Sequence, residues 1–83
     1  KPTVVFGRGG EVLGLKLTDV EQGTLAYQRG LREGDIVERI NGDLLTSTDE
    51  LRVMMEKHQT ADRIVVIVDR DGLKRTLTYN LSR

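Results

Sequence analysis

The sequence has no cysteine, which excludes disulfide bridges and metal sites built from thiolates. Histidine is almost as scarce, because His58 is the only one in the chain. A lone imidazole has no second histidine or cysteine with which to enclose a metal ion. We therefore expect neither a metal site nor a cofactor.

An excess of either charge is also missing, since 13 basic residues balance 13 acidic ones. Without a net positive field, the chain has no general means of collecting phosphates, so nucleic acid is not an expected partner. Long apolar runs are absent too. The longest, Ile64 to Val68, is far shorter than the ~20 residues that span a bilayer, so we expect no membrane contact by this fragment itself.

The chain has 83 residues, of which 37% are hydrophobic and 31% charged. This composition is typical of a globular domain that folds in water. A chain of this length buries only about 60% of its unfolded surface, so we expect residues 1–83 to form one domain around one core. Because the sequence starts at Lys1 without a methionine or a signal-peptide pattern, we interpret it as a fragment of a larger protein.

Glycine positions and apolar periodicity predict six strands and two helices, which indicates an α+β domain. The predicted strands are Thr3–Phe6, Glu11–Leu17, Ile36–Ile40, Leu44–Leu45, Arg63–Val68 and Lys74–Leu81, and the predicted helices are Thr24–Arg29 and Thr48–His58. The strand at 63–68 has no polar residue among its inner five, which indicates a central strand covered on both faces. The last strand alternates apolar with polar residues, which indicates one wet face.

Four glycine-containing sites account for the predicted breaks. The run Gly7-Arg8-Gly9-Gly10 leads from a strand into a strand, so it predicts a hairpin rather than a phosphate loop, which would lead into a helix. Gly14 interrupts the return strand where a bulge would fit. Asn41-Gly42 is a strong signal for a tight turn, and Gly30 ends the short helix through a left-handed cap.

Polar residues that resemble catalytic groups have simpler structural roles. Ser47, three residues before Glu50, has the spacing of a helix capping box, so we interpret it as a cap rather than as a nucleophile. Asp35 follows Gly34 in a turn, where a carboxylate accepts amide hydrogen bonds. His58 is predicted either to cap the helix end or to lie at the rim of a binding groove. No catalytic residue is predicted, and the chain is not expected to be an enzyme.

The segment from Gly23 to Gly42 resembles a run found in bacterial PDZ domains. It contains a short helix, a Gly-Leu-x-x-Gly-Asp turn at 30–35 and an Asn-Gly strand end at 41–42. The resemblance continues through the capped helix and the Arg70-Asp71-Gly72 hairpin, so it covers nearly the whole chain. It implies a PDZ-like fold, with a small antiparallel sheet or partial barrel of five to six strands in the permuted bacterial order.

Within that family, the phrases Gln22-Gly23-Thr24-Leu25 and Asn41 to Thr46 most resemble the PDZ domain of the type II secretion system C protein. This resemblance implies a membrane-anchored parent protein with the domain on the periplasmic side of the bacterial inner membrane. The implied partner is an extended peptide or protein segment, either a secreted protein or a component of the secretion apparatus. The alternative is a regulatory PDZ domain of an envelope protease, of the HtrA-like serine or site-2 intramembrane metalloprotease type.

In a PDZ domain a peptide adds itself as a strand to an open sheet edge, beside a helix. By resemblance, the peptide-binding groove here is formed by Thr3, Val4, Val5 and Phe6 of the first strand and by Thr48, Leu51, Met55 and His58 of the second helix. Leu51 and Met55 are four residues apart and share a helix face, while Val53 or Met54 is expected to point to the core.

A competing interpretation makes Leu15 to Thr18 the binding strand, with Val12 to Leu15 as the family's carboxylate loop. It leaves no further strand before the short helix, so we prefer the first strand. On that choice the carboxylate loop would precede Thr3, where Pro2 has no N–H to donate. Recognition of a free C-terminus therefore does not follow from the sequence, and binding of an internal segment is equally compatible with it.

Overall fold

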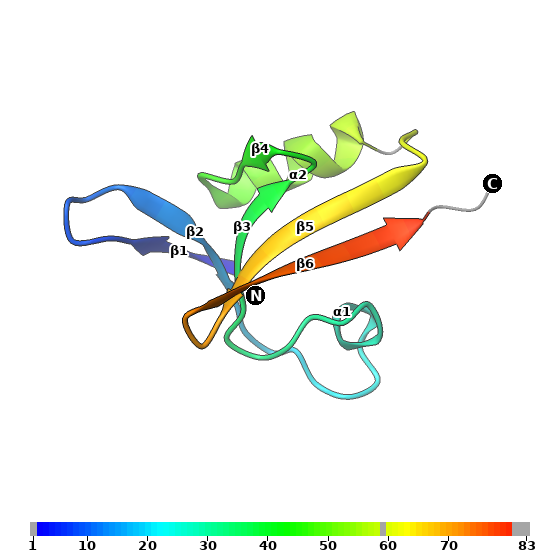
Figure 1. Ribbon diagram of the computed structural model, residues 1–83, viewed down its shortest axis with the longest axis horizontal. Helices are drawn as coiled ribbons and strands as arrows, with labels where there is room; N and C mark the ends of the chain where they lie inside the picture. The colour runs from blue at the N-terminus through cyan, green and yellow to red at the C-terminus, as the bar shows by residue number, and fades with distance from the viewer. Residues whose placement is uncertain (1, 59, 81–83) are drawn as a thin grey trace.

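The computed structural model describes residues 2–58 and 60–80, and it contains six strands and two helices (Figure 1). The elements are β1 (Pro2–Phe6), β2 (Val12–Leu17), α1 (Leu25–Gln28), β3 (Ile36–Ile40), β4 (Asp43–Leu44), α2 (Thr48–Lys57), β5 (Arg63–Arg70) and β6 (Leu73–Asn80). Their order and type match the sequence prediction. The predicted end of the last strand, Leu81, lies outside the described residues.

All six strands belong to one antiparallel sheet that is not closed. The order across the sheet is β1-β2-β3-β5-β6, and the short β4 pairs with β3 off this path. Figure 1 shows the β1–β2 hairpin projecting at one end, α2 alongside β4, and α1 on the side of β6. β1 and β6 are therefore the two outermost strands, and β5 is central, as predicted.

The core lies between the sheet, α2 and the segment after α1. Its buried members come from three strands (β2, β3 and β5), α2 and the loop between β4 and α2: Leu15, Val37, Ile40, Leu45, Met54, Val66 and Val68. β5 was predicted to be covered on both faces. Full burial is found on one face only, where Val66 and Val68 belong to this core. On the opposite face Val65 and Ile67 are half-buried, and their partners in β6, Thr78 and Thr76, are exposed.

Several predicted boundaries differ from the structure by a single residue at one or both ends, namely those of β1, β2, α1, α2 and the start of β6, and two further differences have a physical reason. The fourth strand is Asp43–Leu44 rather than Leu44–Leu45, because Leu45 turns into the core and is fully buried while its N–H donates to Glu38 O at 2.9 Å. The fifth strand continues to Arg70, since pairing with β6 runs without a break up to the Asp71-Gly72 turn. Local propensity does not show how far a neighbouring strand extends the pairing.

The predicted turn chemistry is confirmed at three places. Gly30 has φ of 93°, and the Leu31 N–H donates to Ala26 O at 3.1 Å, so α1 ends in a left-handed cap. Asn41 and Gly42 both have positive φ, as a tight hairpin turn requires. The Ser47 side chain accepts a hydrogen bond from the Glu50 N–H at 3.1 Å and begins α2.

No helix among residues 2–58 and 60–80 is long and apolar enough to cross a membrane.

Candidate functional site

The edge of β1 is open along one side. Its register joins Thr3 to Lys16, Val4 to Leu15 and Val5 to Gly14, all in β2, and the sheet order places no other strand beside it. Val4 packs against the core, so β1 is held firmly from its inner face. The alternate backbone N–H and C=O groups on the outer side are the groups that an added strand would pair with.

A bulge limits the straight part of this edge. The register shifts between Val5 and Phe6, because Phe6 lies opposite Val12 and Leu13 is the extra residue of β2. Gly14 sits at the bulge with φ of 154°, and a Cβ there would come within 2.4 Å of Val37 O. The bulge predicted at Gly14 is thus confirmed. Beyond it Phe6 is 62% exposed, so the regular edge runs from Thr3 to Val5.

β2 does not have an open edge. Leu15 and Lys16 pair with β3 as well as with β1, and the Leu17 N–H donates to Asp35 O at 2.8 Å. A peptide has no access to backbone groups that are already paired on both sides. The competing interpretation, in which Leu15 to Thr18 bind the ligand, is therefore wrong for Leu15 to Leu17.

α2 packs beside β1, and its rotation places different residues on its two flanks. Leu51 is half-buried and packs against the core, while Thr48 is exposed one turn earlier. Both belong to the flank that shares a face with position 55. The side chain of Met55 lies outside the described residues. Met54 is buried and Val53 is 50% exposed, so of the two alternatives it is Met54 that points to the core.

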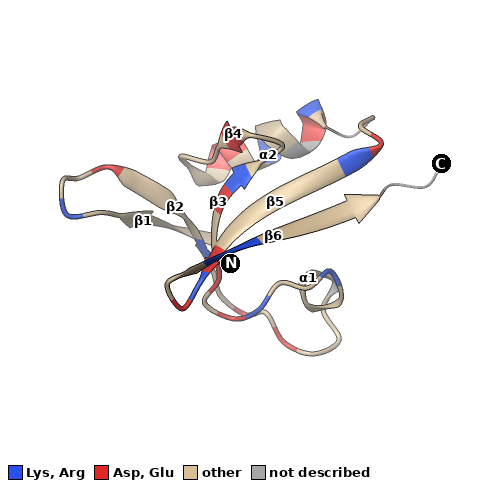
Figure 2. Cartoon of the chain, in the orientation of Figure 1, with Lys and Arg blue, Asp and Glu red and all other residues tan. Residues whose placement is uncertain are grey.

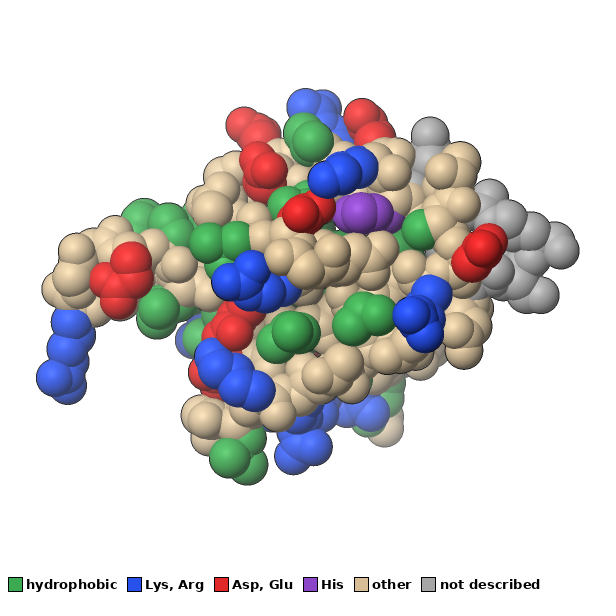
Figure 3. All heavy atoms as spheres, turned by 45° about the horizontal axis from the view of Figure 1, so that its top comes forward, with side chains coloured by type: hydrophobic (Ala, Val, Ile, Leu, Met, Phe, Trp, Pro, Cys, Tyr) green, Lys and Arg blue, Asp and Glu red, His purple; other side chains and the backbone are tan. Residues whose placement is uncertain are grey.

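His58 was predicted either to cap α2 or to lie at the groove rim. It is the C-cap of α2, and its N–H donates to Met54 O at 3.0 Å. Its side chain is only 15% exposed, and Nε2 lies 3.5 Å from Asp43 Oδ2. In Figure 3 the imidazole, the one purple side chain, is visible beside an acidic side chain. The contact described for His58 therefore ties it to β4, which pairs with β3 rather than with β1.

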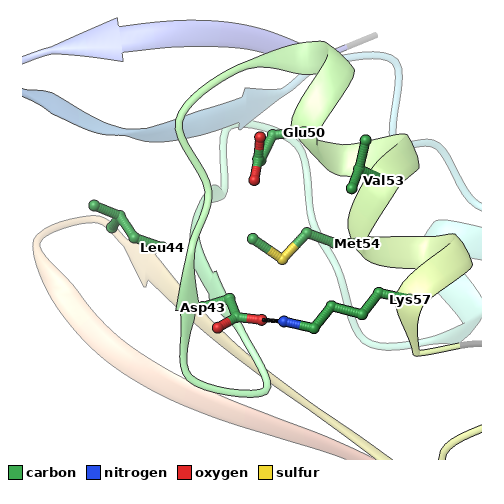
Figure 4. A pocket seen from close by; sticks show the side chains of 6 residues that line it. All are labelled: Asp43, Leu44, Glu50, Val53, Met54 and Lys57. Carbon is green, nitrogen blue, oxygen red and sulfur yellow. Dashed lines mark hydrogen bonds and ion pairs between the residues drawn. The ribbon is translucent and has the colours of Figure 1, made fainter.

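A pocket of about 320 Å³ lies on the other flank of α2, between this helix and β4 (Figure 4). It is lined by Asp43, Leu44, Glu50, Val53, Met54 and Lys57. Lys57 Nζ donates to Asp43 Oδ2 at 2.8 Å across its mouth, and this hydrogen bond and the lysine charge lower the pKa of Asp43. None of the predicted groove residues lines this pocket, and no sequence signal pointed to it.

A polar network joins the turn before β3 to the end of β5. Asp35 is buried, and both its carboxylate oxygens accept from Arg70, at 2.9 and 2.7 Å. Arg70 also donates to Gly30 O, and the Arg32 N–H donates to Asp35 Oδ2 at 2.9 Å. Burial opposes ionisation of Asp35, but these hydrogen bonds and charges outweigh it and lower its pKa. The turn role of Asp35 is confirmed, whereas its pairing with Arg70 was not predicted.

Charges of both signs are interspersed on the face of the molecule drawn in Figure 3. Figure 2 shows basic and acidic residues scattered over the same elements, and on the face drawn in Figure 3 the apolar side chains are separated by both kinds. Among residues 2–58 and 60–80, no three histidine, aspartate or glutamate side chains are grouped as a metal site would require. Recognition by strand pairing and apolar contact fits this surface better than recognition by a charged field.

Comparison with known proteins agrees with this geometry. The chain is 29% identical over 70 residues to the serine protease Do-like HtrA of Lactococcus lactis, in two strains, covering 84% of this chain. The chain spans 17% of the length of these curated relatives. Two structures of the PDZ domain of EpsC from Vibrio cholerae superpose with TM-scores of 0.70 and 0.67 at 22% identity. They cover 98% of this chain, which itself covers 76% and 92% of theirs.

A family model described as the PDZ domain matches residues 5–81. PDZ domains are generally non-catalytic modules that bind peptide or protein segments. The match extends over nearly all of the chain, and the open antiparallel sheet with one short and one longer helix is the PDZ fold. This chain belongs to the PDZ domain family.

Proposed function

We propose that this PDZ domain binds one extended peptide or protein segment along the β1 edge, beside α2, and catalyses no reaction. The observation that carries the proposal is that β1 pairs with β2 alone and has α2 next to it. Backbone hydrogen bonds to Thr3, Val4 and Val5 would supply affinity, and side chains against α2 would supply selectivity.

The chemistry of the α2 flank suggests which ligands fit. In an added strand, successive side chains point to opposite faces, so every second ligand residue faces the helix. Leu51 offers a half-buried apolar surface there, with Thr48 one turn before it and position 55 one turn after it. A ligand with apolar side chains at alternate positions therefore fits this flank. Phe6, exposed beyond the bulge, extends the apolar surface at the end of the edge.

For the cellular setting, we favour a PDZ module of the type II secretion inner-membrane component C, acting in the periplasm. The superposition with the PDZ domain of EpsC, a type II secretion protein C, supports this setting. The ligand would then be a secreted protein or another component of the apparatus. The resemblance of the loop at Asn41 to Thr46 points the same way.

The 29% identity to the HtrA proteases supports a second setting. There the same groove would deliver substrates to a protease domain in the parent protein. The two settings predict different parent sequences. A serine-protease domain or an HExxH membrane helix in the parent supports the protease, and a single N-terminal membrane anchor without either supports the secretion component.

The binding proposal is tested by titrating the ¹⁵N-labelled domain with short extended peptides and following its amide resonances. The peptides carry leucine or valine at alternate positions, each prepared with a free and with an amidated C-terminus. We expect the largest shifts in residues 3–6 and in 48–58. The internal comparison is β6, the other outermost strand. Shifts confined to β6, or shifts in β4 and α2 with residues 3–6 unchanged, would show that the groove is elsewhere.

A further inference from the structure

The second open edge of the sheet is β6, and the groove proposed above does not use it. β6 pairs with β5 through eight consecutive residue pairs, from Arg63–Asn80 to Arg70–Leu73, with no shift in register. No proline and no bulge interrupts it, and most of its side chains are exposed. A straight edge without such interruptions is the kind that pairs with another strand.

The sequence of β6 is self-complementary about Leu77. In an antiparallel pair of two β6 strands centred on that residue, Thr76 of one copy lies opposite Thr78 of the other. Arg75 lies opposite Tyr79, which allows a cation–π contact, and Lys74 lies opposite Asn80. The two copies of Lys74 are then about 20 Å apart along the strands, beyond the screening length in physiological salt. A parallel pair would instead place equal charges side by side.

The position of α1 is compatible with this pairing. α1 and its cap lie against the face of β6 that carries Leu77 and Tyr79, since the Tyr79 hydroxyl donates to Arg29 O and Gly30 faces Leu77. The opposite face, with Thr76 and Thr78, is exposed. The helix thus covers one face of the strand and leaves the Thr76 and Thr78 face exposed.

We infer that β6 is a self-association edge, through which two copies of this domain form an antiparallel, two-fold symmetric dimer with one continuous sheet. Such a strand-to-strand contact is small, so the dimer is weak and depends on concentration. The β1 edges remain free at the two far ends. A dimer therefore presents two peptide grooves. A ligand with two binding segments can occupy both grooves at once, which raises its apparent affinity.

The test is sedimentation velocity over a range of concentrations, with variants at the exposed threonines. Thr76→Lys with Thr78→Lys places introduced lysines opposite each other at two symmetric positions, and we expect the dissociation constant to rise at least about tenfold. Thr76→Glu with Thr78→Lys places opposite charges there instead, and we expect dimerisation equal to or tighter than that of the wild type. Circular dichroism checks that both variants fold.

The matched control is Thr3→Lys, which adds a lysine to the β1 edge and is expected to leave dimerisation unchanged. A wild-type domain that stays monomeric at every concentration would overturn the inference. So would a dimer that Thr3→Lys dissociates while both double variants leave it intact. The outcome is independent of peptide binding, because a failed titration leaves the sedimentation result unaffected.

Discussion

β1 and β6 are both outermost strands of one sheet, yet their surroundings differ. β1 is five residues long, begins with Pro2 and ends at a bulge, and α2 stands beside it. β6 is eight residues long and regular, and α1 packs on its face. A single extended chain fits between β1 and α2, whereas the longer, regular edge of β6, which α1 covers on one face only, can meet another sheet. The neighbouring helix, more than the open edge itself, sets the kind of partner.

The two ends are also stabilised differently. The β1 end depends on close backbone approach, because Gly14 brings β2 against Val37 with no room for a side chain. The β6 end depends on a buried polar network, in which Arg70 joins Asp35 to Gly30. The contact between Gly14 and Val37 leaves no room for a side-chain atom at position 14. The ion pair between Asp35 and Arg70 depends on the protonation state of the Asp35 carboxylate. These properties let each end be disturbed separately.

The largest effect is expected at the β1 end from Gly14→Ala. The added Cβ would meet Val37 O at 2.4 Å, in a backbone conformation that side chains avoid, so we expect a loss of about 3 kcal/mol in the free energy of unfolding. Urea denaturation measures it. The matched control is Gly10→Ala, where φ is also positive but the space is open, with an expected loss of about 1 kcal/mol. Equal losses would mean that β2 does not approach Val37 closely.

At the β6 end, Asp35→Asn removes the partner of Arg70, and we expect a loss of about 2 kcal/mol at neutral pH. The sign of its pH dependence follows from the lowered pKa of Asp35. The ionised carboxylate contributes fully above its ordinary pKa of 3.8, and the contribution is lost as the pH falls below that value. The stability difference between wild type and Asp35→Asn should therefore persist from about pH 7 down to about pH 4 and shrink as the pH falls further.

Urea denaturation at several pH values measures this difference. The control is Asp62→Asn, at an exposed position, which should change the free energy of unfolding little at every pH. A difference between wild type and Asp35→Asn that stays constant down to the lowest pH would contradict the role of the ionised carboxylate.

The smallest expected effect concerns ligand selection beside β1. Leu51→Ala removes apolar surface from the α2 flank, and we expect peptide affinity to fall about fivefold to tenfold. The control is Val53→Ala, on the same helix but exposed and lining the opposite pocket, with affinity unchanged. Isothermal titration calorimetry with a peptide that shifts the β1 resonances measures both. If Val53→Ala weakens binding more than Leu51→Ala, the ligand lies between α2 and β4.

Much of the fold was predictable because its signals are local. The reversal at 7–10, the bulge at Gly14, the cap at Gly30 and the turn at Asn41-Gly42 each depend on the conformations open to one or two residues. Ser47 as a helix cap depends on a residue three positions away. The resemblance to PDZ domains then supplied the order of the strands, which the family match supports.

The site was predictable only in part. The choice between Val53 and Met54 as the core residue needed the rotation of α2, which sequence spacing leaves open to within one position. His58 shares a helical stripe with Leu51, yet it lies against Asp43, which comes from a strand fifteen residues earlier. The groove residues Thr3, Val4, Val5, Phe6, Thr48, Leu51, Met55 and His58 stay a prediction until a ligand is titrated.

By itself, the sequence determined where the chain turns, where each helix begins and ends, and which strands alternate, because these choices are made by backbone preferences within a few residues. Only the tertiary structure decided which edges stay open, that Asp35 pairs with Arg70, and that Asn41 binds the backbone of Val65. These contacts join residues far apart in the chain, and their formation depends on how the whole sheet twists and packs.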